Sequence, residues 1–320
     1  MLGAAPIALA GGGLLANAQT SRTEAGQAEP IQPEPKPQAR GTGRFVLGFN
    51  TSTIRGQNLG IVREIDIASQ AGFTGLEPWV GEIETYQQNG GSLPDLKKRI
   101  EDAGLKVESA IGFFDWVVDD DKQRKNGMEA AKKSMNLVRQ IGGIRIAAPP
   151  VGATKQNDIR LSRIAERYRM LLEIGDQAGV VPQVEIWGFS KTLGRLSEAA
   201  YVAIESGHPK ACILPDVYHL HRGGSSFSGI PLLGPSSIHV FHVNDYPANP
   251  PRQDLTDADR VFPGDGIAPL PKLLEDLREG NFQVMLSLEL FHREYWKQDP
   301  LEVARAGYKK LLAVVERSEH

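Results

Sequence analysis

The sequence predicts an α/β protein folded as a (β/α)8 TIM barrel. From Arg44 onward, short apolar runs alternate eight times with longer segments of helical periodicity, over the roughly 275 residues that are typical of such a barrel. The first predicted strand leads into Asn50-Thr51-Ser52-Thr53 and lacks the glycine-rich phosphate loop of an open doubly wound sheet. The barrel is therefore favoured over the open sheet.

The first 43 residues are expected to lie outside this single domain. Residues 1–18 form an apolar run that ends in Ala16-Asn17-Ala18, a pattern typical of signal peptidase cleavage. No Lys or Arg precedes the run, so we expect an export signal whose basic segment lies further upstream. Residues 19–43 are rich in Pro and Glu and predict a disordered linker, so the barrel should span 44–318.

Composition and charge limit which binding partners and which cellular location are expected. A hydrophobic content of 41% in 320 residues is enough for a large core. The formal net charge of −3 provides no broad basic surface, which makes nucleic acid a poor candidate partner. The single cysteine, Cys212, cannot form an internal disulfide and is expected in the core. Together with the N-terminal run, these features predict a periplasmic or secreted protein without a stable membrane span.

The elements follow one another in regular order. The predicted strands span residues 44–50, 74–79, 106–113, 144–150, 181–187, 210–220, 237–247 and 282–290. The predicted helices span residues 60–71, 93–103, 128–141, 161–178, 196–206, 270–279 and 301–316. After the sixth strand, residues 221–233 predict a loop with a short helix. A glycine at 72, 104, 179 and 280 predicts left-handed helix stops before the next strand.

Polar side chains lie at the ends of the last four strands. Side chains alternate between the two faces of a strand, so Glu185, Asp216, His242 and Glu289 should all point to the barrel interior. His239 falls on the opposite face of the same strand as His242, toward the helices. Barrel enzymes carry their chemistry at the carboxyl ends of the strands. Four ligand-type side chains are thus expected at one rim.

Three carboxylates at one barrel rim repel each other unless a cation lies between them. Three oxygen donors and one imidazole suit Mn²⁺, Mg²⁺, Co²⁺ or Zn²⁺. Any one of these groups alone would more often be a salt-bridged carboxylate or a core histidine. All four on adjacent strands predict one divalent metal ion.

The ordered motifs resemble the xylose isomerase-like TIM barrel superfamily of sugar phosphate isomerases and epimerases, which includes ketose 3-epimerases and inosose isomerases. The resemblance runs from about Arg44 to Leu312 and rests on Glu185 of strand 5, Asp216-x-x-His219, His242-x-Asn244-Asp245, Asp259-Arg260-x-x-Pro263-Gly264-Asp265-Gly266 and Leu286-Ser287-Leu288-Glu289.

The resemblance implies roles for these residues. Glu185, Asp216, His242 and Glu289 match the family's metal ligands, with Mn²⁺ as the expected ion. Glu185 and Glu289 also match the pair that removes and returns a proton next to a carbonyl, through an enediolate. His219 and Arg260 match positions that bind substrate oxygens.

Other positions are candidates for binding a sugar or polyol substrate. Glu77 could contact the sugar or form a buried salt bridge. The aromatic residues near strand ends could form an apolar wall for the ring or belong to the core: Trp79, Phe114, Trp116 and Trp187.

Three other functions stay open. A dehydratase or lyase acting on keto-sugars or inososes would use the same metal and base. A nuclease similar to endonuclease IV needs extra histidines, and the predicted ends of strands 3 and 4 have none. A non-catalytic sugar-binding module has no need for paired carboxylates. A homo-oligomer is a further expectation, because such barrels often pair.

Overall fold

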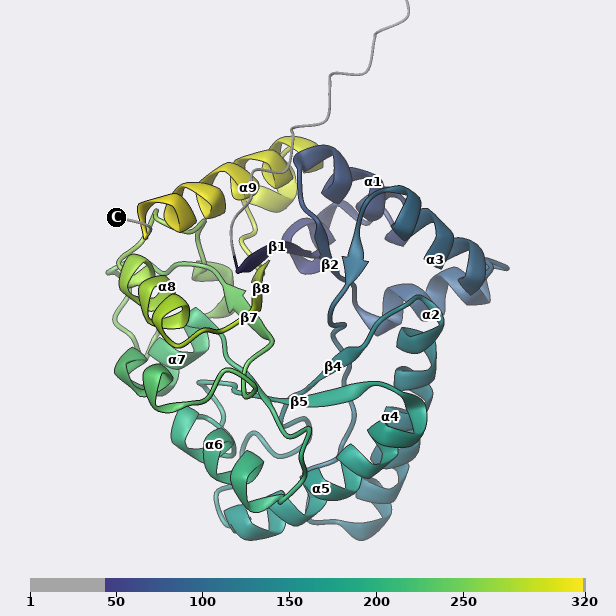
Figure 1. The fold of residues 1–320 in the computed structure, drawn as a ribbon, viewed down its shortest axis with the longest axis vertical. Coiled ribbons are helices and arrows are strands. Elements are labelled where there is room, and N and C mark those ends of the chain that lie inside the picture. The colour runs from purple at the N-terminus through teal and green to yellow at the C-terminus, as the bar shows by residue number, and fades with distance from the viewer. Residues whose placement is uncertain (1–43, 319–320) are drawn as a thin grey trace, which may run out of the picture. The chain divides into compact units, whose positions relative to one another are not determined.

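The structure is a computed structural model that describes residues 44–318, and the predicted signal peptide and linker lie outside them. Eight strands form the centre, and helices form a ring around them (Figure 1). The TIM barrel prediction is confirmed. The strands are β1 (Phe45–Asn50), β2 (Gly75–Glu77), β3 (Lys106–Val107), β4 (Arg145–Ala148), β5 (Val181–Glu185), β6 (Ile213–Leu214), β7 (Val240–Val243) and β8 (Val284–Leu288).

These strands pair in parallel and form two sheets, with the strand orders β3-β2-β1-β8-β7 and β4-β5-β6. Two contacts join the two sheets into a closed barrel. Backbone hydrogen bonds of Ala110 with Arg145 and Ala147 link the chain after β3 to β4. Parallel bridges between Ile213 and Ile238 and between Asp216 and His242 link β6 to β7.

The α-helices surround this barrel. They are α1 (Ile61–Ala71), α2 (Val80–Gln88), α3 (Leu93–Asp102), α4 (Asp121–Gln140), α5 (Leu161–Ala178), α6 (Leu196–Glu205), α7 (Val217–Gly223), α8 (Leu270–Glu279) and α9 (Pro300–Arg317). Four short 3-10 helices lie in the loops: η1 (Thr51–Gln57), η2 (Phe227–Leu232), η3 (Asp257–Asp259) and η4 (Tyr295–Lys297). Among the described residues, no helix is both long and apolar enough to cross a membrane.

Several predicted boundaries were wrong. The sixth strand ends at Leu214 because the Asp216 carboxylate accepts a hydrogen bond from the His219 backbone N–H and thereby caps α7. Helix α2 was missed, and α4 begins seven residues earlier than predicted. The glycine stops at 72, 104 and 179 are confirmed by positive φ angles. Gly280 is not left-handed, because Asn281 takes that conformation with φ of 59°.

The core has two layers, as the strand alternation predicts. Alternate strand residues such as Phe241 and Val243 pack with the helices in the larger layer. The barrel interior holds a small apolar cluster of Ile111, Ala147, Leu214, Val240 and Met285. Buried polar side chains of the same strands lie further toward their carboxyl ends. The barrel interior is therefore polar at the rim formed by the carboxyl ends of the strands and apolar further from that rim.

Candidate functional site

Three of the four predicted ligand residues come together at the rim. Asp216, His242 and Glu289 are all buried, and each offers one donor atom within 4.8 Å of the others. His242 Nδ1 lies 3.2 Å from Glu289 Oε2 and 3.7 Å from Asp216 Oδ2. The parallel bridge between Asp216 and His242 fixes the first two side chains on neighbouring strand ends.

Two carboxylates and an imidazole at this spacing form a donor set that fits a divalent cation. Neither ring nitrogen of His242 has a hydrogen bond of good geometry, although both lie at ion-pair distance from carboxylates. Burial alone would lower the pKa of His242, but Glu289 and Glu77 raise it well above its usual range. The positive charges beside the two carboxylates come from His242 and from Arg260, whose Nη1 contacts both Asp216 and Glu289.

Glu185 lies beside this cluster and is not one of its three residues. Its Oε1 accepts a hydrogen bond of 2.9 Å from Trp187 Nε1, while the buried Oε2 has no hydrogen-bond partner among the described residues. Burial raises the pKa of Glu185 to about 8, and the charges of Glu289 and Asp216 add to the rise. Glu185 and Glu289 both line a cavity of about 220 Å³. The two predicted catalytic carboxylates therefore face one space.

Glu77 is fully buried, and it is not among the residues that line the cavity. Its Oε2 lies 3.0 Å from His242 Nε2 and accepts a hydrogen bond of 2.7 Å from Ser287. It also accepts a hydrogen bond from Asn50, whose Nδ2 reaches Glu289 Oε1 as well. This placement fits the salt-bridge alternative for Glu77 better than contact with a sugar. A carboxylate on the far nitrogen of an imidazole is the usual way to orient a metal-ligating histidine.

Asn50 is a site residue that the sequence reasoning missed. It ends β1, caps η1 and connects Glu77 with Glu289, and its Oδ1 accepts a hydrogen bond from Trp79 Nε1 at 3.0 Å. Its position at a strand end, where the barrel rule places functional residues, is the signal that could have identified it.

Arg260 lies in the centre of the site and is almost fully buried. Its Nη1 donates hydrogen bonds to Asp216 at 2.9 Å and to Glu289 at 2.7 Å. Its Nη2 lies 3.1 Å from His219 Nε2 and also binds Asp257. Burial lowers the pKa of His219 to about 3, so this imidazole is neutral at physiological pH. The predicted pair of Arg260 and His219 is thus brought together at the ligand cluster.

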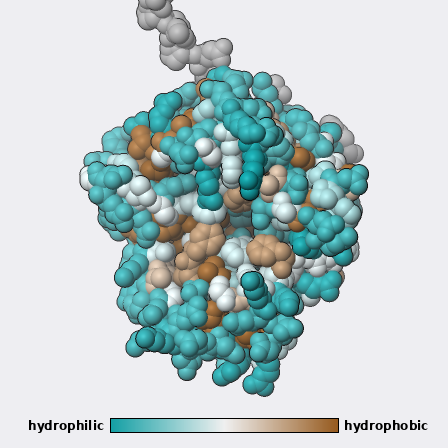
Figure 2. Space-filling model, turned by 180° about the vertical axis from the view of Figure 1, so that it is seen from behind, coloured by the Kyte–Doolittle hydropathy of each residue, from teal (hydrophilic) through white to brown (hydrophobic). Residues whose placement is uncertain are grey.

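Aromatic rings surround the mouth of the cavity. They include Trp79, Phe113, Trp187, Phe189 and Phe291. Successive rings touch, with centroids 5.1 Å apart for Trp79 and Phe113 and 5.4 Å apart for Trp187 and Phe189. The surface is hollowed near the centre of the face in Figure 2, and hydrophobic side chains gather at the edge of the hollow.

Two of the four aromatic candidates belong to the core, which is the second of the two predicted alternatives. Trp116 and Phe114 are buried in the core, where Trp116 Nε1 donates to the carbonyl of Pro149. Phe113 takes the place that was expected for Phe114 and is 45% exposed. The chain leaves regular strand geometry after β3, so the alternation of faces does not extend to these residues.

Comparisons with known proteins found relatives that match most of this chain. An inosose isomerase from Halalkalibacterium halodurans is 30% identical over 278 residues, which cover 85% of this chain and 96% of the relative. An inosose isomerase from Bacillus velezensis is 26% identical over 278 residues, covering 85% and 97% of the two chains.

Solved structures share the fold. The IOLI protein, solved with a binding zinc atom, superposes with a TM-score of 0.78 at 22% identity and covers 85% of this chain and 98% of its own. An L-ribulose 3-epimerase has a TM-score of 0.68 at 17% identity, with 86% and 95% covered. The family model described as xylose isomerase-like TIM barrel matches residues 65–314. The chain therefore belongs to the xylose isomerase-like TIM barrel family.

Proposed function

We propose that this protein is a divalent-metal-dependent isomerase or epimerase of a keto-sugar or inosose, acting through an enediolate. It is an isomerase-type enzyme, as its curated relatives are. The observation that carries the proposal is the convergence of Asp216, His242 and Glu289 beside Glu185 in one buried cavity. Paired carboxylates next to a cation site serve proton transfer at a carbon beside a carbonyl.

Asp216, His242 and Glu289 would hold the cation, with Glu185 as a fourth donor. A bound cation would supply Lewis acidity that stabilises negative charge on the substrate oxygens. Glu185 and Glu289 would remove the proton from one face of the carbon and return it to the other. Arg260 and His219 would bind the substrate oxygens and keep them oriented. Mn²⁺ is our proposal for the ion, and the donor set also fits Mg²⁺, Co²⁺ and Zn²⁺.

A neutral, ring-sized substrate fits this cavity best. Its volume of about 220 Å³ is small, and its mouth is aromatic. Aromatic faces suit the apolar side of a sugar or cyclitol ring. The names of the curated relatives support an inosose as the first substrate to test.

The test is solvent deuterium incorporation with Mn²⁺-loaded protein, across a panel of inososes and keto-sugars. Deuterium should appear at the carbon next to the carbonyl, followed by the isomerised or epimerised product. Loss of water from the substrate would identify the dehydratase alternative, which shares the first step. No exchange with any substrate, together with no bound metal, would contradict the proposal.

We also propose that the protein is exported to the periplasm or the medium. We further propose that it forms a homo-oligomer and does not bind nucleic acid. The export proposal rests on the apolar run of residues 1–18. Expression of the full-length gene in its host, followed by cell fractionation and N-terminal sequencing, would locate the protein and any cleavage site. Light scattering would give its mass.

A further inference from the structure

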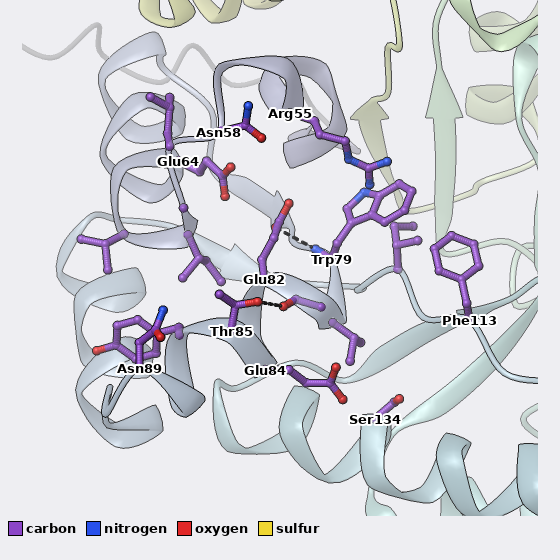
Figure 3. Close-up of a pocket in the computed structure, with 18 of the residues that line it drawn as sticks. Arg55, Asn58, Glu64, Trp79, Glu82, Glu84, Thr85, Asn89, Phe113 and Ser134 are labelled. Carbon is purple, nitrogen blue, oxygen red and sulfur yellow. Dashed lines mark hydrogen bonds between the residues drawn. The ribbon is translucent and has the colours of Figure 1, made fainter.

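A second, larger cavity lies next to the proposed active site. It has a volume of about 990 Å³, is open to solvent, and is lined by residues of η1, α1, α2 and α4 (Figure 3). Trp79, Ile111 and Phe113 belong to the walls of both cavities. A group bound in the second cavity would therefore be only one side chain away from the proposed reaction centre.

A buried carboxyl without a partner points into this cavity. Glu64 of α1 is only 3% exposed, lines the cavity, and its Oε2 has no hydrogen-bond partner among the described residues. Burial and the nearby Glu82 raise the pKa of Glu64 to about 8. Leaving such a group unsatisfied costs free energy, which a hydroxyl-bearing ligand would recover. In Figure 3 the side chains of Glu64 and Glu82 extend toward each other in the cavity.

The Arg55 guanidinium and the Trp79 ring lie on the side of the second cavity that faces the active site. The Arg55 guanidinium carbon lies 3.4 Å from the centroid of the Trp79 ring. The Arg55 guanidinium also lies 5.8 Å from the centroid of the Phe291 ring, and the charges of Glu82, Glu289 and Glu64 act on it. Asn58 and Asn89 add amide groups to the wall. Hydrogen-bond donors and acceptors beside an aromatic ring suit a ligand with many hydroxyl groups.

We propose that the second cavity is a subsite for a further sugar unit, so that the preferred substrate is a glycoside or disaccharide of the reacting keto-sugar. This inference rests on the proposed function and names its substrate class. The reacting ring would lie in the small cavity between Glu185 and Glu289. The attached unit would pass Trp79 and Phe113 and bind Glu64 and Arg55.

The experiment compares a free ketose with ketoses that carry a glucosyl unit. Fructose would be measured beside turanose, leucrose, maltulose and isomaltulose, by deuterium exchange and by titration calorimetry with Mn²⁺-loaded protein. At least one disaccharide should bind about tenfold more tightly than fructose and exchange with a higher kcat/KM, as expected when a second set of hydrogen bonds is made.

Two variants separate the subsite from the reaction centre. Gly81 lies in the cavity wall, and a Cβ built there meets nothing within 4 Å, so Gly81→Leu adds a side chain to the wall at a position with open space around its Cβ. Glu64→Leu replaces the carboxyl group with an apolar side chain of similar size, which suits a buried helix position. Both variants should weaken disaccharide binding about tenfold and leave the affinity for fructose unchanged. Glu101→Leu, on the exposed face of α3, is the matched control and should change neither.

The outcomes separate the two proposals. Equal affinity for fructose and every disaccharide, or variants that affect both alike, would overturn the subsite. Tighter disaccharide binding that both variants weaken, without deuterium exchange in any of these sugars or in the inososes, would support the subsite and count against the proposed isomerase.

Discussion

Glu289 contacts three other residues of the site. It lies 3.2 Å from His242 Nδ1, accepts from Asn50 and accepts from Arg260. Burial alone would raise the pKa of Glu289, yet His242 and Arg260 hold it below its usual range. An ionised carboxylate in this position can act both as a ligand and as a base.

Glu289→Gln should abolish most of the deuterium exchange. Removing a positioned acid–base group costs about 10²–10⁴-fold in rate. Arg260 keeps Asp216 and Asp257 as partners, so its buried charge stays compensated and the fold should survive. Exchange rate, circular dichroism and bound manganese would be measured together. A folded, manganese-loaded variant with full activity would remove Glu289 from the acid–base role.

Glu77 should act through His242. Its Oε2 lies 3.0 Å from His242 Nε2, so it would orient the ring whose other nitrogen faces Asp216 and Glu289. Glu77→Gln should weaken manganese affinity about 10–100-fold, as loss of such a supporting carboxylate typically does. Competition with a fluorescent chelator would measure the affinity, and saturating manganese should restore kcat. Ser287→Ala removes one donor to the same oxygen and should have a smaller effect. Unchanged affinity in Glu77→Gln would show that the contact is purely structural.

At the scale of elements, two glycines inside helices illustrate what sequence patterns can and cannot predict. Helix propensity favours alanine over glycine at both positions. In α4, a Cβ on Gly127 would lie 2.5 Å from the backbone carbonyl carbon of Asp115, whereas in α2 a Cβ on Gly81 meets nothing within 4 Å. Only the packed structure distinguishes these sites, because the contact of Gly127 comes from another segment.

Gly127→Ala should destabilise the protein by about 2 kcal/mol, because an atom forced against rigid backbone costs more than the propensity gain. Gly81→Ala should instead stabilise it by about 0.5–1 kcal/mol. Urea unfolding of the two variants beside the parent would measure both changes. Stabilisation by Gly127→Ala would mean that the Asp115 segment moves away at little cost.

The boundaries of strands and helices also show what sequence patterns can and cannot predict. The alternation of side chains correctly placed His242 in the barrel interior, on the face that it shares with Val240, while Phe241 of the opposite face packs among the helices. The predicted length of the sixth strand was wrong, because the cap of α7 ends the strand at Leu214, although Asp216 itself reaches the rim as predicted. Helix α2 was missed because most of its face is exposed and polar. Patterns predict buried elements well, and they predict capped or exposed ends poorly.

At the scale of the whole molecule, the site depends on barrel closure. Asp216 and His242 come from strand ends that lie on either side of the junction between the two sheets, and Glu289 follows β8. The sequence predicted that these residues share a rim, since parallel strands end together. It could not predict that Asn50 and Arg260 connect them, because those hydrogen bonds depend on how distant loops pack.

A cation held by these residues would join three strand ends across that junction, so its binding should stabilise the folded barrel. A ligand that binds only the native state at 100 times its Kd adds about 2.7 kcal/mol. At about 2–4 °C per kcal/mol for a domain of this size, manganese should raise Tm by about 5–10 °C over protein in chelator. Differential scanning calorimetry would measure the shift, with Asp216→Asn expected to lose most of it. As a control, Asp66→Asn, on the outer helix α1, should keep the full shift. Equal Tm values with manganese and chelator would contradict a cation site at this junction.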